Sequence, residues 1–166
     1  MTIIIGIDPG SIKTGFGIIK KEKNKLMHVA HGTIVAKGDS IAARLYFIYK
    51  NLCEVIALHQ PNQSAIEEVF MHANVQSALK LGQARGVALV ALAHHAVPVH
   101  EYSARVVKKT ATGYGAADKT QMQFMVKMQL GLKENPPVDA ADALAIAICH
   151  AQHHFLVCEV KKSFPV

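Results

Sequence analysis

The sequence has few cysteines and no long apolar run, and each absence excludes a class of protein. Its three cysteines, Cys53, Cys149 and Cys158, are widely spaced and match neither a disulfide framework nor a zinc-ligand pattern. No uninterrupted apolar run reaches the roughly 18 residues that a membrane helix needs. No charged segment precedes the short apolar N-terminal stretch, as it would in a secretory signal. We therefore expect a protein in a reducing, cytoplasmic environment.

Acidic residues are scarce between Tyr102 and Lys133, a stretch in which Asp118 is the single acidic residue. The whole chain carries a formal net charge of +6. The basic residues of this stretch are Arg105, Lys108, Lys109, Lys119, Lys127 and Lys133. Any one of these side chains fits a solvated helix face, but their excess over acids favours contact with a polyanion such as nucleic acid.

The apolar pattern predicts an α/β protein with a mixed sheet. We expect strands at residues 3–8, 14–20, 26–36, 64–70 and 97–102. We expect helices after a cap at Asp39 or Ser40, and at residues 75–96, 103–110, 118–131 and 138–152. Residues 1–152 form one predicted domain, and we expect the tail at residues 153–166 to be only partly ordered, since it shows no clear period.

The first strand ends on a carboxylate, in the stretch IIIGIDPGSIKTG. Asp8 followed by Pro9 is ordinary chemistry for starting a turn. It is also what a metal ligand held at the end of a rigid strand would look like. The N-terminal segment alone leaves both interpretations open.

Two further segments carry unexpected carboxylates. Glu67 lies in the apolar strand SAIEEVF. It is either a functional carboxylate in a buried strand or a solvated side chain on an edge strand. Asp139 and Asp142 are three residues apart, on one face of the last predicted helix. The helix dipole accounts for one acid in a first turn, but two like charges so close indicate a bound cation.

Asp8, Glu67, Asp139 and Asp142 together are the kind of ligand set that two magnesium ions require. Hard cations prefer oxygen ligands, and a pair of them supports in-line displacement at a phosphate. The ten histidines are a rival source of ligands. However, the pairs His94–His95 and His153–His154 are sequence neighbours and cannot both point into one tetrahedral zinc site from a helix. We interpret them as surface or packing residues.

Four segments, in order, resemble the RuvC family of Holliday-junction resolvases, which are ribonuclease H-like nucleases. They are GIDPGSIKTGFG, AIEEVF, SALKLGQARG and DAADALAIAI, and the resemblance extends from about Ile3 to Ala151. It implies a five-stranded mixed sheet flanked by helices, in a homodimer that cuts four-way DNA junctions. The implied reaction is a pair of symmetric nicks in strands of like polarity during recombination and DNA repair. The RuvA and RuvB branch-migration complex is an implied partner.

The same resemblance assigns roles to residues. It implies that Asp8, Glu67, Asp139 and Asp142 hold two Mg²⁺ ions per subunit, with Mn²⁺ as a substitute. It places Lys108 and Lys119 near the scissile phosphate. Because of the basic excess of the stretch that contains them, we also expect Arg105 and Lys109 to contact the DNA. Phe70 corresponds to an aromatic residue that can stack on an unpaired base. Glu68 receives no role.

Three alternatives are open at this level. DPGSIKTG also resembles the phosphate-binding hairpin of the actin and sugar-kinase group, although we find no second Gly-rich loop and no second domain. A non-catalytic junction-binding subunit would not need four carboxylates. A nuclease of the same superfamily that acts on RNA or RNA–DNA hybrids fits the basic stretch equally well.

Overall fold

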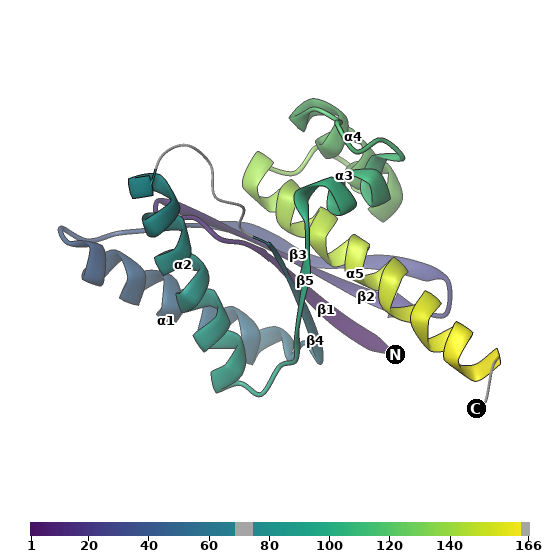
Figure 1. Cartoon of the computed structure of the whole chain (residues 1–166), viewed down its shortest axis with the longest axis horizontal. Helices are drawn as coiled ribbons and strands as arrows, with labels where there is room; N and C mark the ends of the chain where they lie inside the picture. Colours follow the sequence, from purple (N-terminus) through teal and green to yellow (C-terminus); the bar gives the residue numbers. More distant parts are fainter. Residues whose placement is uncertain (69–74, 164–166) are drawn as a thin grey trace.

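The computed structural model describes residues 1–68 and 75–163, with residues 154–163 described by their backbone only. Its architecture is a single sheet with helices on both faces (Figure 1). The strands are β1 (Thr2–Asp8), β2 (Lys13–Glu22), β3 (Lys25–Val35), β4 (Gln63–Glu67) and β5 (Val99–Tyr102). The helices are α1 (Ile41–His59), α2 (Val75–His94), α3 (Ala104–Thr112), α4 (Lys119–Leu130) and α5 (Val138–Ser163).

The sheet has the strand order β3-β2-β1-β4-β5. The first three strands form an antiparallel meander, while β4 pairs parallel with both β1 and β5. This confirms the predicted five-stranded mixed sheet. It also shows that β4 is an interior strand, which excludes the solvated-edge interpretation of Glu67.

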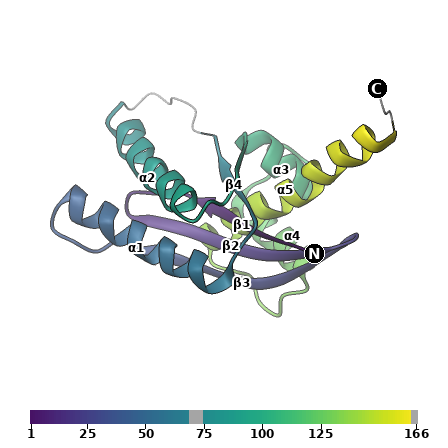
Figure 2. The same ribbon diagram turned by 90° about the horizontal axis from the view of Figure 1, so that it is seen from below.

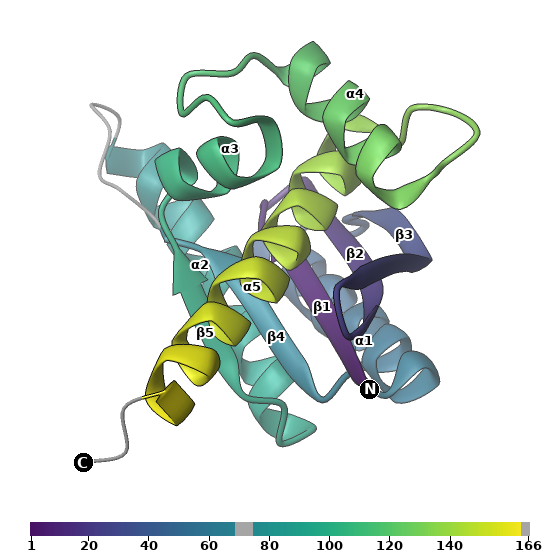
Figure 3. The same cartoon turned by 90° about the vertical axis from the view of Figure 1, so that its right-hand side faces the viewer.

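Two hydrophobic clusters lie on opposite faces of the sheet. Helices α1 and α2 cover one face, and α5 covers the other, with α3 and α4 beside its N-terminal half (Figures 2 and 3). Alternation along each strand assigns side chains to the clusters. Ile4 and Ala65 belong to the α5 side, whereas Ile5 and Ile66 belong to the α1–α2 side.

Several helix boundaries have a recognisable cap. Ser40 caps α1 by accepting a hydrogen bond from the backbone N–H of Ala43 at 3.1 Å. Asp118 and Gln121 form a capping box at the start of α4. Gly113 ends α3 with φ of 79°, a left-handed conformation that glycine adopts without strain.

Two boundaries differ from the sequence prediction by more than two residues. Strand β4 ends at Glu67, whereas the prediction continued it to residue 70, because the apolar pair Val69–Phe70 extends the strand pattern. Helix α5 continues to Ser163, so the predicted end near residue 152 is wrong. The prediction used periodicity, which the tail lacks, but a helix already formed can continue without it. The division into a domain and a tail stays a prediction.

Among the residues that the structure describes, none of the helices combines the length and the hydrophobicity of a membrane-spanning segment.

Candidate active site

Asp8 and Glu67 are brought to one edge of the sheet by parallel pairing. Ile7 lies opposite Ile66 in the β1–β4 register, so the next residue of each strand is a carboxylate at the C-terminal end. Strand alternation places both acids on the α5 side, with Ile4 and Ala65. The rigid strands therefore present two half-buried carboxylates to the same region.

Helix α5 adds its acids by lying directly on the sheet, because three glycines remove the side chains that would hold it away. A methyl group built on Gly15 would lie 2.0 Å from the backbone oxygen of Asp139. The same construction at Gly6 and Gly17 meets the helix backbone at 2.1 and 2.7 Å. Gly15 is the cross-strand partner of Asp8, so this contact sets the first turn of α5 beside the end of β1.

The acids and two lysines surround a cavity of about 280 Å³. Its charged lining residues are Asp8, Glu67, Asp142, Lys108, Lys119 and Asp118. Asp139 does not line this cavity in the described chain, although its charge acts on the carboxyl groups of both Asp8 and Asp142. The structure thus brings together three of the four predicted carboxylates and both predicted lysines.

The electrostatics of the cavity favour a cation. Burial, together with repulsion from Asp142, Glu67 and Asp139, raises the pKa of Asp8 to about 7. Burial also raises the pKa of Glu67, with a further contribution from Asp142. A divalent ion would reverse this preference for protonation, because it stabilises the ionised forms.

The donor set fits a hard divalent metal, since it consists of carboxylate oxygens. In the described residues, however, no three Asp, Glu, His or Cys side chains lie close enough together to hold an ion as they stand. The shared cavity and the mutual repulsion support a metal site, and the assignment of individual ligands stays a prediction.

Lys108 and Lys119 partly offset the upward pKa shifts of the carboxyl groups in the cavity. Lys119 lowers the pKa of Asp8 and of Asp142, and Lys108 lowers that of Glu67. Their ammonium groups are therefore close enough to act on an anion bound in the cavity. Arg105 and Lys109 line a neighbouring cavity instead, and Phe70 lies outside the described residues.

The sequence analysis missed a residue that supports Glu67. Arg85 of α2 donates a hydrogen bond to the backbone oxygen of Glu67 at 3.3 Å and pairs with the carboxylate of Glu101 on β5. It therefore ties the ends of β4 and β5 to α2. The motif SALKLGQARG contains Arg85, but its sequence alone does not show which strand the side chain reaches.

The sheet order, its helical layers and the acids at its parallel strand ends are those of a ribonuclease H-like nuclease, and comparison with known proteins identifies the family. The family described as "Crossover junction endodeoxyribonuclease RuvC" matches residues 4–150. The protein of that name from Coxiella burnetii (strain RSA 493 / Nine Mile phase I) is 56% identical over 149 residues, 90% of this chain and 87% of the relative. That from Haemophilus ducreyi is 52% identical over 162 residues, 96% of this chain and 84% of the relative.

A solved structure agrees. "T. thermophilus RuvC in complex with Holliday junction substrate" superposes with a TM-score of 0.88 at 33% identity, covering 95% of this chain and 97% of the other. The chain therefore belongs to the RuvC family of crossover junction endodeoxyribonucleases, as its motifs predicted. Nucleases of this family are metal-dependent.

Proposed function

We propose that this protein resolves four-way DNA junctions by paired, symmetric nicks in strands of like polarity, within homologous recombination and DNA repair. The observation that carries the proposal is one cavity lined by three of the four predicted carboxylates and by two lysines, in a chain of the RuvC family. The T. thermophilus relative, solved with its Holliday junction substrate, supports the choice of DNA.

In this proposal Asp8, Glu67, Asp139 and Asp142 hold two Mg²⁺ ions, which Mn²⁺ can replace. Ions held there would supply Lewis-acid chemistry for activating a water and stabilising the leaving oxygen. The chain's own contribution is to fix the carboxylates on two strand ends and one helix. Lys108 and Lys119 neutralise the charge that develops on the phosphate.

Incubation with three substrates tests the proposal: a synthetic mobile four-way junction, a linear duplex of the same sequence and an RNA–DNA hybrid. We expect paired nicks in the junction alone, and only when Mg²⁺ is present. Cleavage of the hybrid in preference to the junction would favour the RNA-directed alternative. Stabilisation by ATP–Mg²⁺ without any cleavage would favour the nucleotide-binding alternative.

The two cavity lysines should be distinguishable from a peripheral one. Lys108→Ala and Lys119→Ala should each lower kcat at saturating junction by about 10²-fold, because their charge acts where the transition state forms. Lys127→Ala, near the C-terminal end of α4, should weaken binding and flatten its salt dependence while leaving kcat unchanged. Equal effects of all three changes on kcat would contradict the assignment.

We also propose that the protein acts as a homodimer through α2. Leu79, Gly82, Gly86 and Val90 recur at helical spacing on this helix, where Leu79 and Val90 are 63% and 58% exposed. A methyl group at either glycine would meet nothing within 4 Å. An open apolar face of this kind supports close helix contact across a two-fold axis that matches the DNA.

Val90→Glu should therefore yield a folded monomer that nicks junctions poorly and does not make paired cuts. Light scattering and a cruciform cleavage assay measure the two effects. Met128→Glu is the matched control, since Met128 is equally exposed at 61% but lies on α4. The half-buried Leu89 packs on the core and is unsuitable for this test. A dimeric Val90→Glu protein would contradict the proposed interface.

Two further assignments rest on the family and the composition. We place the reaction in the cytoplasm, which the free thiols of Cys53 and Cys149 support. We also propose that the protein works with the RuvA and RuvB branch-migration complex.

A further inference from the structure

A second cavity adjoins the carboxylate cavity, and the proposed reaction as described does not use it. Its volume is about 590 Å³, and it lies between α3 and the turn that follows. Arg105, Lys108 and Lys109 line it together with Tyr114, and no acidic side chain is among its lining residues in the described chain. A space with three cations and an exposed aromatic ring suits a nucleotide, which offers a phosphate and a base.

The turn that carries Tyr114 is fixed by hydrogen bonds. The backbone N–H of Tyr114 donates to the hydroxyl of Thr112 at 3.1 Å, and that hydroxyl lies 2.8 Å from the backbone oxygen of Lys108. The N–H of Gly113 donates to the carbonyl of Lys109 at 2.8 Å. The cavity wall is therefore held in place before any ligand arrives, which reduces the entropy cost of binding.

Arg105 is held over the same turn. A methyl group on Gly115 would lie 3.1 Å from the Cγ and 3.6 Å from the Nε of Arg105, so the glycine lets the arginine stem lie against the turn. The side chain of Tyr114, by contrast, is 65% exposed and has its ring available for stacking. The charged and aromatic parts of the cavity are thus provided by different segments.

The two cavities share Ala104 and Lys108. A DNA strand whose scissile phosphate lies at the carboxylates would therefore continue into the basic cavity with its next nucleotide. Lys108 would be close to both phosphates. The opposite charges of the two cavities also favour the uncompensated phosphate of this neighbouring nucleotide in the basic cavity rather than among the carboxylates.

We propose that the basic cavity binds the nucleotide next to the scissile phosphate, with its phosphate at Arg105 and Lys109 and its base stacked on Tyr114. This inference rests on the proposed function. Stacking on an aromatic side chain contributes about 1–3 kcal/mol per base, and it tolerates different bases. Tyr114 thus positions the strand without specifying its sequence.

A fluorescent base tests the subsite. Two junctions are prepared, with 2-aminopurine at the nucleotide on one side of the cut or on the other. The fluorescence of the probe is recorded with protein bound in EDTA, so that no cleavage occurs. We expect wild type and Tyr114→Phe to quench the probe on one side, because both present an aromatic ring. Tyr114→Ala should leave the probe unquenched and raise KM about tenfold at unchanged kcat.

Phe124→Ala is the matched control, since Phe124 is also exposed, at 53%, and does not line the cavity. It should quench and cleave as wild type does. One outcome would overturn the subsite but not the proposed function: wild type cuts junctions normally, and Tyr114→Ala gives the same result as Phe124→Ala in both assays. A wild-type protein that does not cut junctions would overturn the proposed function and the subsite with it.

Discussion

Replacing Asp8 with asparagine is expected to lower the rate of junction cleavage by at least about 100-fold while junction binding persists. The amide keeps the shape of the side chain but cannot neutralise a divalent ion, and metal-centred stabilisation of a transition state contributes several kcal/mol. Single-turnover cleavage and a gel-shift assay measure the two properties. Asp39→Asn is the matched control, because Asp39 is an exposed aspartate outside the cavity. Near-normal cleavage by Asp8→Asn would contradict the metal-site assignment.

The same change should make the metal-free protein more stable at neutral pH. The pKa of Asp8 is raised from 3.8 to about 7 in the folded protein, so the folded state binds a proton more tightly than the unfolded chain does. The free energy of unfolding of wild type therefore falls as pH rises through this range. Asparagine removes the cost of burying an ionised carboxylate. The difference in the free energy of unfolding between Asp8→Asn and wild type should therefore be absent near pH 4 and reach its maximum above about pH 7.

We expect Asp8→Asn to gain about 1–3 kcal/mol at pH 8. The full shift corresponds to about 4 kcal/mol, but a proton can also bind to Asp142 or Glu67, whose pKa values are raised as well. Urea unfolding in EDTA at equal protein concentration measures the gain. Adding Mg²⁺ should stabilise wild type and have little effect on Asp8→Asn. A variant less stable than wild type at pH 8 would contradict the electrostatic account.

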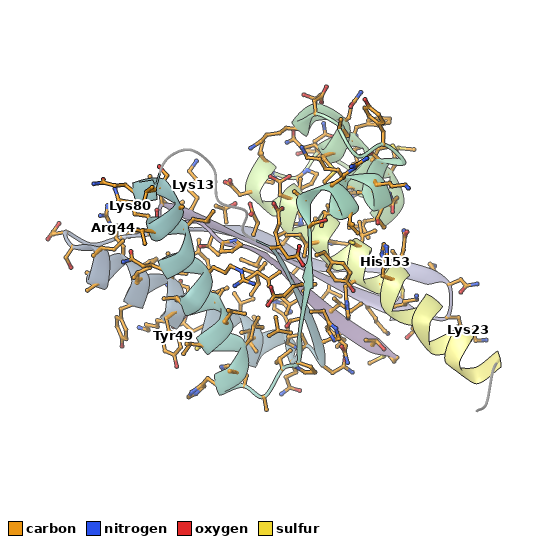
Figure 4. The ribbon with its side chains drawn as sticks, in the orientation of Figure 1. Lys13, Lys23, Arg44, Tyr49, Lys80 and His153 are labelled. Atoms are coloured by element: carbon orange, nitrogen blue, oxygen red, sulfur yellow. The ribbon has the colours of Figure 1, made fainter. Side chains whose placement is uncertain are left out.

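Basic side chains from different elements lie in one region of the molecule. Figure 4 shows Lys13 of β2, Arg44 of α1 and Lys80 of α2 toward the same end of the molecule, away from Lys23 and His153. These residues are far apart in the sequence and do not form a basic run. The net charge of +6 predicted a polyanionic partner, but only the fold shows which basic side chains share a region.

The sequence predicted that Asp8 and Glu67 lie on apolar strands and that a helix begins at Val138, because those features depend on local patterns. Asp8 and Glu67 each follow a run of apolar residues, and parallel pairing of two such strands brings their ends together. The relative positions of Asp139 and Asp142 could not be predicted in this way. Their spacing puts both on one face of α5, but Asp142 lines the cavity and Asp139 does not. That difference depends on the contact of α5 with the sheet, where the backbone of Asp139 lies against Gly15.

Residues that act through tertiary contacts were also missed. Arg85 supports Glu67 across 18 positions of the sequence, and no local period signals the contact. Tyr114 lines one cavity with Arg105, which the sequence already placed at the DNA, but the sequence did not show that the turn through Gly113 and Gly115 brings Tyr114 to it. In each case the residue type was visible in the sequence, but its partner was not. The family resemblance supplied the site because it carries that three-dimensional information.

The contact between Gly15 and α5 leads to the second large expected effect. Gly15→Ala should lower junction cleavage by at least about 100-fold although it removes no charged or polar group. The added methyl would lie 2.0 Å from the backbone oxygen of Asp139, so the first turn of α5 must move away from the sheet. Displacing catalytic groups by about 1 Å can cost that factor in rate. Overpacking should also destabilise the protein by about 1–3 kcal/mol.

Gly32→Ala is the matched control, because Gly32 lies on the neighbouring strand β3 and its added methyl would meet the ring of Phe16 at 2.8 Å. A side chain can turn aside, whereas the backbone of α5 cannot. Gly32→Ala should therefore lose stability but keep its cleavage rate and its stabilisation by Mg²⁺, and Gly15→Ala should lose both of these properties. Equal cleavage by the two variants, at a temperature where both are folded, would show that the seating of α5 on Gly15 does not position the acids.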